Sequence, residues 1–421
     1  MRPPFQSIAF DPAEPRSALS RLPREAAVFA LYGEADHAEP YIGRTPNLLG
    51  RLERLLIPSP KHPKRLQLAS RVRRIEWRAT GSEFEALLLQ FNLLQEVYGT
   101  KCLDRMHLRM PAFVRFLGGN PYPRVTVTNR LRLGKSSQRE AVWFYGPFAS
   151  RAAAERYAEE MLKLFLLRRC TDDLNPDPSH PGCVYSEMKM CLAPCYKGCT
   201  DERYSEESTA VERFLATRGE SRLVTLKTER DEASAILAFE SAAAIHAQVQ
   251  KVESVRALVA ELVRPLDLLR VILLQESAQP DEVAVFLFDK GRLRGPAGFS
   301  TQGMRIQNEQ SGSSSLFAQP MAIEPVPEDS SEASAVPQVS RNVLEERIGS
   351  VLAELTEAMD APSATTRQGH LALLKRWYYR PEVKRPGEIF FPDAEGNWPV
   401  KALLRGVGRV VAKSLATAKP A

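Results

Sequence analysis

The sequence has no apolar run approaching the roughly 18 residues of a membrane-spanning helix, and it contains no tandem repeat. Its first six residues, Met1 to Gln6, lack the apolar core of a secretory signal peptide. Cysteine is scarce as well, with six among 421 residues. These absences predict a soluble cytoplasmic protein with no membrane partner. In that compartment clustered cysteines bind metals more often than they form disulfides.

Positive charge is only slightly in excess, with a net charge of +6, but the basic residues are unevenly distributed along the chain. Residues 41–80 hold ten lysines and arginines against two acidic residues, and a second basic stretch runs from Lys101 to Arg139. Acidic residues collect at 201–262 and 324–360. A basic N-terminal half fits a polyanionic partner, most simply nucleic acid, and an ordinary solvated surface is the alternative.

Hydrophobic periodicity predicts an α+β protein of several domains. Near the N-terminus, strands at 26–33 and 40–44 form a hairpin, and helices follow at 47–57 and 83–97. The later elements expected are strands within 113–145, a helix at 152–166, charged helices at 202–256, a β meander of strands at 268–274, 282–288 and 293–299, and a helix at 341–355. The Ser-, Glu-, Pro- and Gln-rich segment 307–339 cannot bury a core and is expected to be a disordered linker.

Five of the six cysteines lie within thirty residues. They are Cys170, Cys183, Cys191, Cys195 and Cys199. Clustered thiolates suit a soft metal ion or an iron–sulfur centre. Zinc also takes four thiolates, but the spacing lacks the paired Cys-x₂-Cys of zinc ribbons. The chemistry alone leaves iron–sulfur, zinc and no metal open. Nearby Arg168, Arg169 and Lys189 are expected on a solvated or DNA-facing surface.

Four motifs follow one another along the chain. They are Ala27-Val-Phe-Ala-Leu31 with Tyr41-Ile-Gly-Arg44 and Asn47 to Leu52, then Tyr145-Gly-Pro-Phe148, then the cysteine cluster, then Leu237-Ala-Phe-Glu-Ser-Ala-Ala243. The first resembles the GIY-YIG nuclease signature, and the last resembles the UVR helical hairpin. Taken in order over about residues 20–300, they resemble the UvrC family of excinucleases. That resemblance implies a nucleotide excision repair protein that binds DNA and a UvrB-like helicase.

The resemblance also implies catalytic positions in the GIY-YIG-like unit. Tyr41 matches the tyrosine near the attacking nucleophile, and Arg44 the basic residue after the signature. Arg51 matches the arginine that contacts the phosphate, for which a guanidinium fork is suited. The family's glutamate that holds Mg²⁺ or Mn²⁺ is replaced by Gln90, which brings no charge to offset dehydration of the ion. Glu83 shares a helix face with Gln90 but lies about two turns, roughly 10 Å, away.

Three further positions depart from that family's pattern. Phe29 stands where the first strand has a tyrosine, Leu55 where the first helix has one, and Cys102 where an asparagine follows the second helix. Together with Gln90, these losses predict a decayed site in a module that binds DNA or only packs. Metal-dependent phosphodiester incision by a GIY-YIG-type endonuclease is the alternative.

The same resemblance implies a cofactor and a partner surface. The cluster ligands of a [4Fe-4S] centre would be Cys170, Cys183, Cys191 and Cys195, with zinc as the alternative metal. Cys199 and Cys102 are expected to be bystanders. The UVR-like hairpin would bind the helicase through Phe239, Glu240 and Ala243. His246 and Ala247 replace the family's Arg and Asp, which predicts a weakened or altered affinity for the helicase.

These patterns predict the following divisions: an N-terminal extension at 1–20, a GIY-YIG-like α/β unit at 21–105, a strand region with a Cys-rich helical module at 106–205, a UVR-like hairpin at 206–260, a small β meander at 261–306, the linker at 307–340, and a helical C-terminal region at 341–421. The chain is expected to lack the RNase H-like nuclease half of the family, because 300–421 has no suitable Asp/Asp/His set. The run from Leu374 to Arg380, Leu-Lys-Arg-Trp-Tyr-Tyr-Arg, suits either stacking on nucleic acid or a core.

Three functions are compatible with this sequence. The first is a repair protein that binds DNA and a helicase and makes one incision. The second is an inactive adaptor or regulator of the excision repair complex. The third is an iron–sulfur redox sensor that does not bind DNA. Salt-dependent DNA affinity separates the third from the other two.

Overall fold

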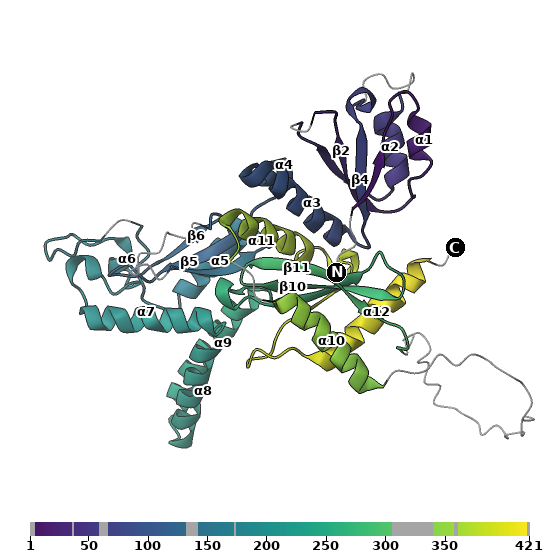
Figure 1. Cartoon of the computed structure of the whole chain (residues 1–421). Coiled ribbons are helices and arrows are strands. Elements are labelled where there is room, and N and C mark those ends of the chain that lie inside the picture. The colour runs from purple at the N-terminus through teal and green to yellow at the C-terminus, as the bar shows by residue number, and fades with distance from the viewer. Residues whose placement is uncertain are drawn as a thin grey trace, which may run out of the picture.

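The computed structural model describes residues 5–35, 38–58, 66–131, 142–171, 174–304, 340–357 and 361–418. It is a mixed helix-and-sheet protein of several parts, built around three four-stranded antiparallel sheets (Figure 1). The linker predicted at 307–340 lies, except for Ser340, outside the described residues. Within the described ranges, no helix has the length and apolar character needed to cross a membrane.

The first sheet has the order β1-β4-β2-β3. Its elements are β1 (Gln6–Ala9), α1 (Pro15–Leu19), β2 (Ala27–Tyr32), β3 (Tyr41–Thr45), α2 (Leu48–Leu56) and β4 (Arg74–Ala79). The leucines of α2 recur at helical spacing and pack on Phe29, Leu31 and Trp77. The strand pairing of β1 with β4 and the burial of Leu19 place the residues expected as an N-terminal extension in this same unit.

Helix α3 (Glu83–Tyr98) covers the other face of the first sheet and links it to the rest of the protein. Ala86 and Leu89 pack on Val28 of β2. Five other apolar residues of α3 belong to the core of the third sheet: Phe84, Leu87, Leu88, Phe91 and Leu94. The helix is therefore apolar around most of its circumference because it is buried on two sides.

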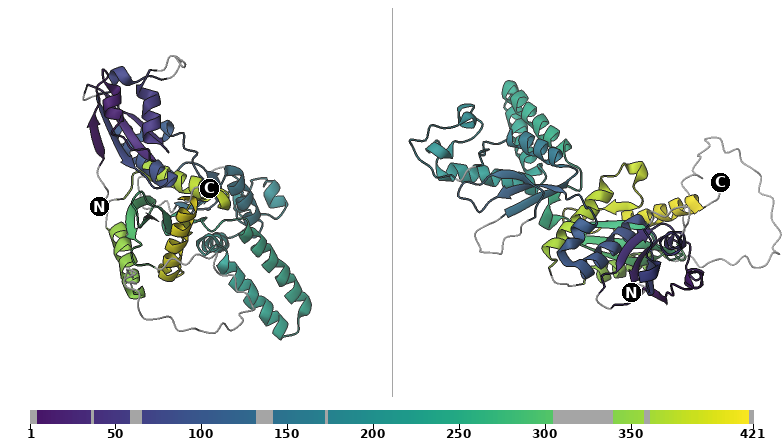
Figure 2. Two further views of the ribbon diagram at one scale, coloured as in Figure 1. Left: turned by 90° about the vertical axis from the view of Figure 1, so that its right-hand side faces the viewer. Right: turned by 90° about the horizontal axis from the view of Figure 1, so that it is seen from above.

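The second sheet, ordered β6-β5-β7-β8, carries the cysteine segment and a long hairpin. Helix α4 (Cys102–Arg105) packs on α3 and precedes this sheet. The elements of the second sheet are β5 (Ala112–Leu117), β6 (Val125–Thr128), β7 (Val142–Phe148), α5 (Arg151–Leu162), α6 (Val184–Glu187), α7 (Asp201–Ala216), α8 (Glu220–Ala235), α9 (Phe239–Ala257) and β8 (Arg264–Pro265). Helices α5 and α7 share one core with the base of α8 and α9. The α8–α9 hairpin projects away from this core (Figures 1 and 2).

The third sheet, ordered β11-β10-β9-β12, joins the predicted meander to the C-terminal region. Its elements are β9 (Val271–Glu276), β10 (Glu282–Asp289), β11 (Arg292–Ser300), α10 (Arg341–Thr356), α11 (Ala364–Tyr378), β12 (Glu388–Phe390) and α12 (Val400–Ala418). Val283 and Val285 face α10 and α12, whereas Ala284 and Phe286 face α3 and α11. Both faces are covered, which explains the continuous apolar run of β10.

Candidate functional site

The four cysteines expected to hold a metal centre line one pocket. Cys170, Cys183, Cys191 and Cys195 form its wall together with Arg168, Arg169, Leu174, Tyr185 and Pro194. Cys199 is not among the lining residues and packs against the core of the second sheet. Cys102 is completely buried in the core between α3 and the third sheet. The structure therefore separates the four cysteines from the other two.

An irregular backbone brings Cys191 and Cys195 to this pocket. Three non-glycine residues around them, Lys189, Ala193 and Lys197, adopt the left-handed conformation with φ of 54°, 54° and 58°. Each such residue costs free energy, and residues of this kind concentrate at functional sites. The backbone N–H of Ala193 points at Cys191 and donates to its Sγ over 3.3 Å. This geometry holds the Cys191 sulfur in the pocket.

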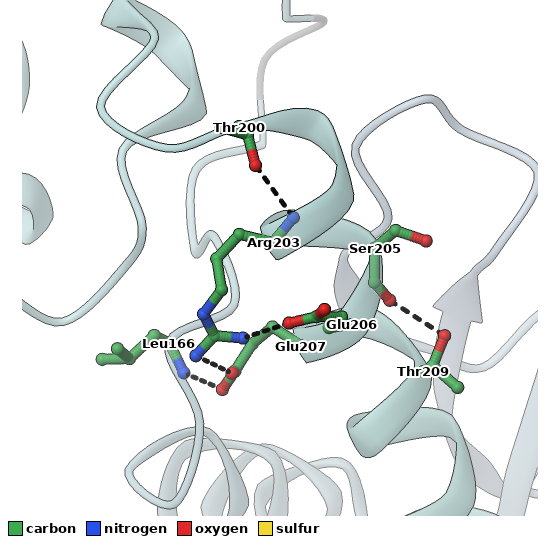
Figure 3. Close-up of polar contacts among 7 residues, drawn as sticks. All are labelled: Leu166, Thr200, Arg203, Ser205, Glu206, Glu207 and Thr209. Atoms are coloured by element: carbon green, nitrogen blue, oxygen red, sulfur yellow. Dashed lines mark hydrogen bonds and ion pairs between the residues drawn. The ribbon is translucent and has the colours of Figure 1, made fainter.

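Helix α7 fixes the chain at Leu166, four residues before Cys170 (Figure 3). Glu207 accepts a hydrogen bond from the backbone N–H of Leu166 at 2.7 Å, and Arg203 holds Glu207 at 3.1 Å. The carbonyl of Leu166 in turn accepts a hydrogen bond from Leu192 at 3.0 Å. Thr200 caps α7 by accepting a hydrogen bond from the N–H of Arg203. The segments that lead into Cys170 and Cys191 are thus joined through Leu166.

Arg168 is buried, contrary to the expectation of a solvated or DNA-facing surface, because its chain segment passes beneath α7. Its side chain is 1% exposed, its Nε donates to the carbonyl of Tyr122 at 2.9 Å, and its Nη1 lies 3.6 Å from Sγ of Cys170. The hydroxyl of Tyr204 accepts from the N–H of Arg168 and donates to the carbonyl of Pro123. These hydrogen bonds fix the Arg168 guanidinium from inside the core, against the sulfur of Cys170.

The donor set of the pocket suits a thiolate-bound group. Burial raises the pKa of the Cys191 and Cys195 thiols, and the neighbouring cysteines raise it further, so binding of a metal releases protons. Across the ranges that the structure describes, no group of three or more His, Cys, Asp or Glu side chains is arranged to hold one metal ion. The four thiols surround a common pocket without converging on a single point.

The residues of the predicted nuclease site lie on two faces of the first sheet. Tyr41 faces α2, where Nη2 of Arg51 donates to its hydroxyl over 3.3 Å. Arg44, three residues further along β3, faces α3 and forms an ion pair with Glu83 at 3.6 Å. Gln90 lies half-buried on α3, and no hydrogen bond or ion pair between described residues joins it to Tyr41, Arg44 or Arg51.

Both carboxylates in the first turn of α3 are already engaged. Glu83 is held by three arginines: Arg44, Arg376 at 3.6 Å and Arg380 at 2.9 Å. Glu85 is 7% exposed and accepts a hydrogen bond from the N–H of Gly81 at 2.9 Å. A carboxylate that is neutralised or used in capping is a poor ligand for a hard cation.

The three other departures from the nuclease pattern are buried apolar positions. Phe29 and Leu55 pack in the core between α2 and the first sheet, and Cys102 packs beneath α3. Each side chain fills space rather than facing a site. Arg376 and Arg380 were not predicted to be neighbours of Arg44, although the basic and aromatic run at 374–380 was a signal that these residues had a specific role.

The α8–α9 hairpin exposes apolar side chains at its tip. Ile236, Leu237 and Phe239 are 78%, 71% and 65% exposed, and Leu237 has a φ of 59° that turns the chain between the helices. Glu240 and Ala243 are also exposed on α9. The base of the hairpin is closed by an ion pair of Glu220 with Arg256 at 2.8 Å and by buried leucines and valines. A tip of this kind suits a protein partner.

Comparison with known proteins identifies similar sequences. Residues 119–214 match the family described as UvrC/Cho excinuclease, middle domain, a segment that contains the cysteine pocket. The chain is 27% identical to the UvrABC system protein C of Alcanivorax borkumensis over 58% of this chain and 39% of that protein. It is 32% identical to the protein of the same name from Psychrobacter cryohalolentis over 57% of this chain and 38% of that protein. The corresponding protein of Ruminiclostridium cellulolyticum is 26% identical over 68% of this chain and 46% of that protein.

The chain spans less than half the length of these curated relatives. No solved structure matches it.

Proposed function

Because the chain belongs to the UvrC family of excinucleases, we propose that it acts in nucleotide excision repair by binding DNA and a UvrB-like helicase. The basic N-terminal module would bind the DNA backbone, and the tip of the α8–α9 hairpin would bind the helicase. The module binds without cutting. The observation that most supports this is the engagement of Glu83 by three arginines and of Glu85 by Gly81, beside a neutral Gln90.

Incision is the second candidate function, and the Tyr41–Arg51 hydrogen bond favours it. In that case Tyr41 would lie beside the nucleophile, Arg51 would stabilise charge on the phosphate, and Mg²⁺ or Mn²⁺ would supply Lewis acidity. Arg51 and Tyr41 are on the same side of the sheet, so these two roles are geometrically compatible.

A nicking assay separates the two candidates. The wild-type protein, with a UvrB helicase and Mg²⁺ or Mn²⁺, is expected to bind a damaged duplex without nicking it. Gln90→Glu tests whether the absent carboxylate is the only defect, since cutting by that variant alone would still support the binding function. Nicking by the wild type that Arg51→Ala abolishes would establish the enzyme instead.

The cysteine pocket is proposed to hold a [4Fe-4S] cluster, with zinc as the alternative. In a [4Fe-4S] cluster each thiolate binds a different iron, so the four sulfurs surround the inorganic core instead of meeting at one atom. The lining of one pocket by Cys170, Cys183, Cys191 and Cys195 supports this assignment. Arg168 beside Cys170 would offset part of the negative charge of the thiolates.

The hairpin proposal predicts a partner-binding defect without a folding defect. Phe239→Ala is expected to weaken binding of a UvrB helicase about tenfold or more, as truncation of an aromatic anchor does. Because Phe239 is 65% exposed, the thermal unfolding midpoint should not change. Isothermal titration calorimetry measures the affinity. Val224→Ala, which alters a 56% exposed side chain near the start of α8 and far along the chain from the tip, is the matched control and should leave the affinity unaltered.

A further inference from the structure

Three arginines from two distant parts of the chain surround a single carboxylate. Arg44 comes from β3, whereas Arg376 comes from the last turn of α11 and Arg380 follows that helix. Their guanidinium nitrogens lie 3.6, 3.6 and 2.9 Å from the oxygens of Glu83. Both side chains reach the same carboxylate, so Arg376 and Arg380 project toward α3 from the end of α11. Figure 1 shows α11 lying alongside α3, which carries Glu83.

Helix α11 is held in place independently of these charges. Trp377, between the two arginines, is 2% exposed and donates from Nε1 to the carbonyl of Pro386 at 3.0 Å. Thr366 accepts a hydrogen bond from Gln95 of α3 at 2.7 Å. The run at 374–380 thus has two parts, since Leu374 and Trp377 are core residues while Arg376 and Arg380 face Glu83. The core packing places the two arginines beside Arg44.

The charges of this group do not balance among themselves. Three cations meet one anion, which leaves two positive charges in excess. Burial lowers the pKa of Arg44, Glu83 opposes that effect, and Arg376 and Arg380 lower it further. The side chains of Arg44, Arg376 and Arg380 remain 33%, 43% and 25% exposed, so an anion from solution can reach them. A group with this excess of charge attracts a further anion.

We propose that Arg376 and Arg380 join Arg44 in one binding site for phosphates of the DNA backbone. The site rests on the DNA binding proposed above and gives the C-terminal region a role in it. Guanidinium forks match phosphate oxygens, and neutralisation of phosphates by arginine supplies much of the affinity of proteins for DNA. Glu83 occupies the arginines in the absence of DNA and competes with the phosphates for them.

The competition by Glu83 distinguishes a DNA site from an ion-pair group that only fastens α11 to α3. If the arginines bind phosphates, Glu83→Gln frees them and tightens DNA binding severalfold. If the group only fastens the helix, Glu83→Gln lowers the thermal midpoint and leaves DNA affinity the same or weaker. The sign of the change in affinity therefore separates the two roles.

The test uses fluorescence anisotropy of a labelled duplex with the full chain over a range of salt concentrations. The double variant Arg376→Ala/Arg380→Ala is expected to bind at least tenfold more weakly at low salt. When the logarithm of its association constant is plotted against the logarithm of the salt concentration, the negative slope should be less steep by about two, one for each lost phosphate contact. Arg376→Lys/Arg380→Lys, which keeps the charge, should retain most of the slope.

The matched control is Arg341→Ala/Arg405→Ala, which removes the same charge from the exposed faces of α10 and α12. It should leave the slope near that of the wild type. Inorganic phosphate at matched ionic strength serves as a second arm, and displacement of DNA by millimolar phosphate would assign the site to the free anion. A wild-type slope in the alanine variant overturns this inference alone, whereas a wild-type protein that does not bind DNA overturns the proposed function as well.

Discussion

Replacement of Cys191 by serine is expected to abolish the cluster bound by the anaerobically purified protein and to lower its thermal midpoint by roughly 10 °C or more. The sulfur of Cys191 receives the N–H of Ala193, and the left-handed residues around it are strained. The proposed cluster would offset that strain, because metal binding energy contributes directly to folding. Iron and sulfide analysis, an absorption spectrum and a thermal melt measure the three consequences.

Cys199→Ser provides the control for the cysteine prediction. Cys199 is a half-buried cysteine four residues beyond Cys195, but it does not line the pocket. Its substitution should leave the iron content and the spectrum as they are in the wild type. Wild-type protein that contains zinc and no iron would make zinc the resident metal, and protein with neither would refute the metal centre. Loss of iron in the Cys199 variant would show that the ligand set is wrong.

The sequence was informative where short-range periodicity decides the structure. The leucine spacing of α2 and the apolar runs of β9 to β11 predicted those elements closely, because each segment buries one helical stripe or one or both strand faces. The family resemblance singled out the four cysteines that line one pocket, and a metal centre held by them stays a prediction. These features depend on residues that are close in sequence or chemically distinctive.

What could not be predicted depends on contacts between remote segments. Strand β12 pairs with β9 more than one hundred residues earlier, and Ile389 lies opposite Leu273 in that register. The arginines around Glu83 meet it only because α11 docks on α3. Arginine is a residue type usually found on the surface, yet Arg168 is buried because its segment passes beneath α7. No local pattern in the sequence encodes such a docking.

Gly369→Ala is expected to loosen α11 from α3, and its effect should be among the largest of any single-methyl substitution in this chain. A Cβ at residue 369 would lie 2.2 Å from both Cε2 and Cζ of Phe91. Phe91 is completely buried and its ring packs on His370, so the ring has little room to move. Overpacking of this kind costs about 1–3 kcal/mol. Urea denaturation measures the loss, and hydrogen–deuterium exchange should place the added opening in α3 and α11.

Two comparisons test the cause of that loss. Gly349→Ala adds the same methyl group in α10, where nothing lies within 4 Å of the new Cβ, and should stabilise the protein by roughly 0.5–1 kcal/mol through helix propensity. Phe91→Ala removes the ring that the new methyl group would strike. In the Phe91→Ala background, Gly369→Ala should lower the free energy of unfolding by about 1 kcal/mol less than it does in the wild type. A coupling of this size is expected only for residues in contact. Additive effects would mean that α11 does not pack on α3 through Gly369, and the position of Arg376 and Arg380 beside Arg44 would then lack its support.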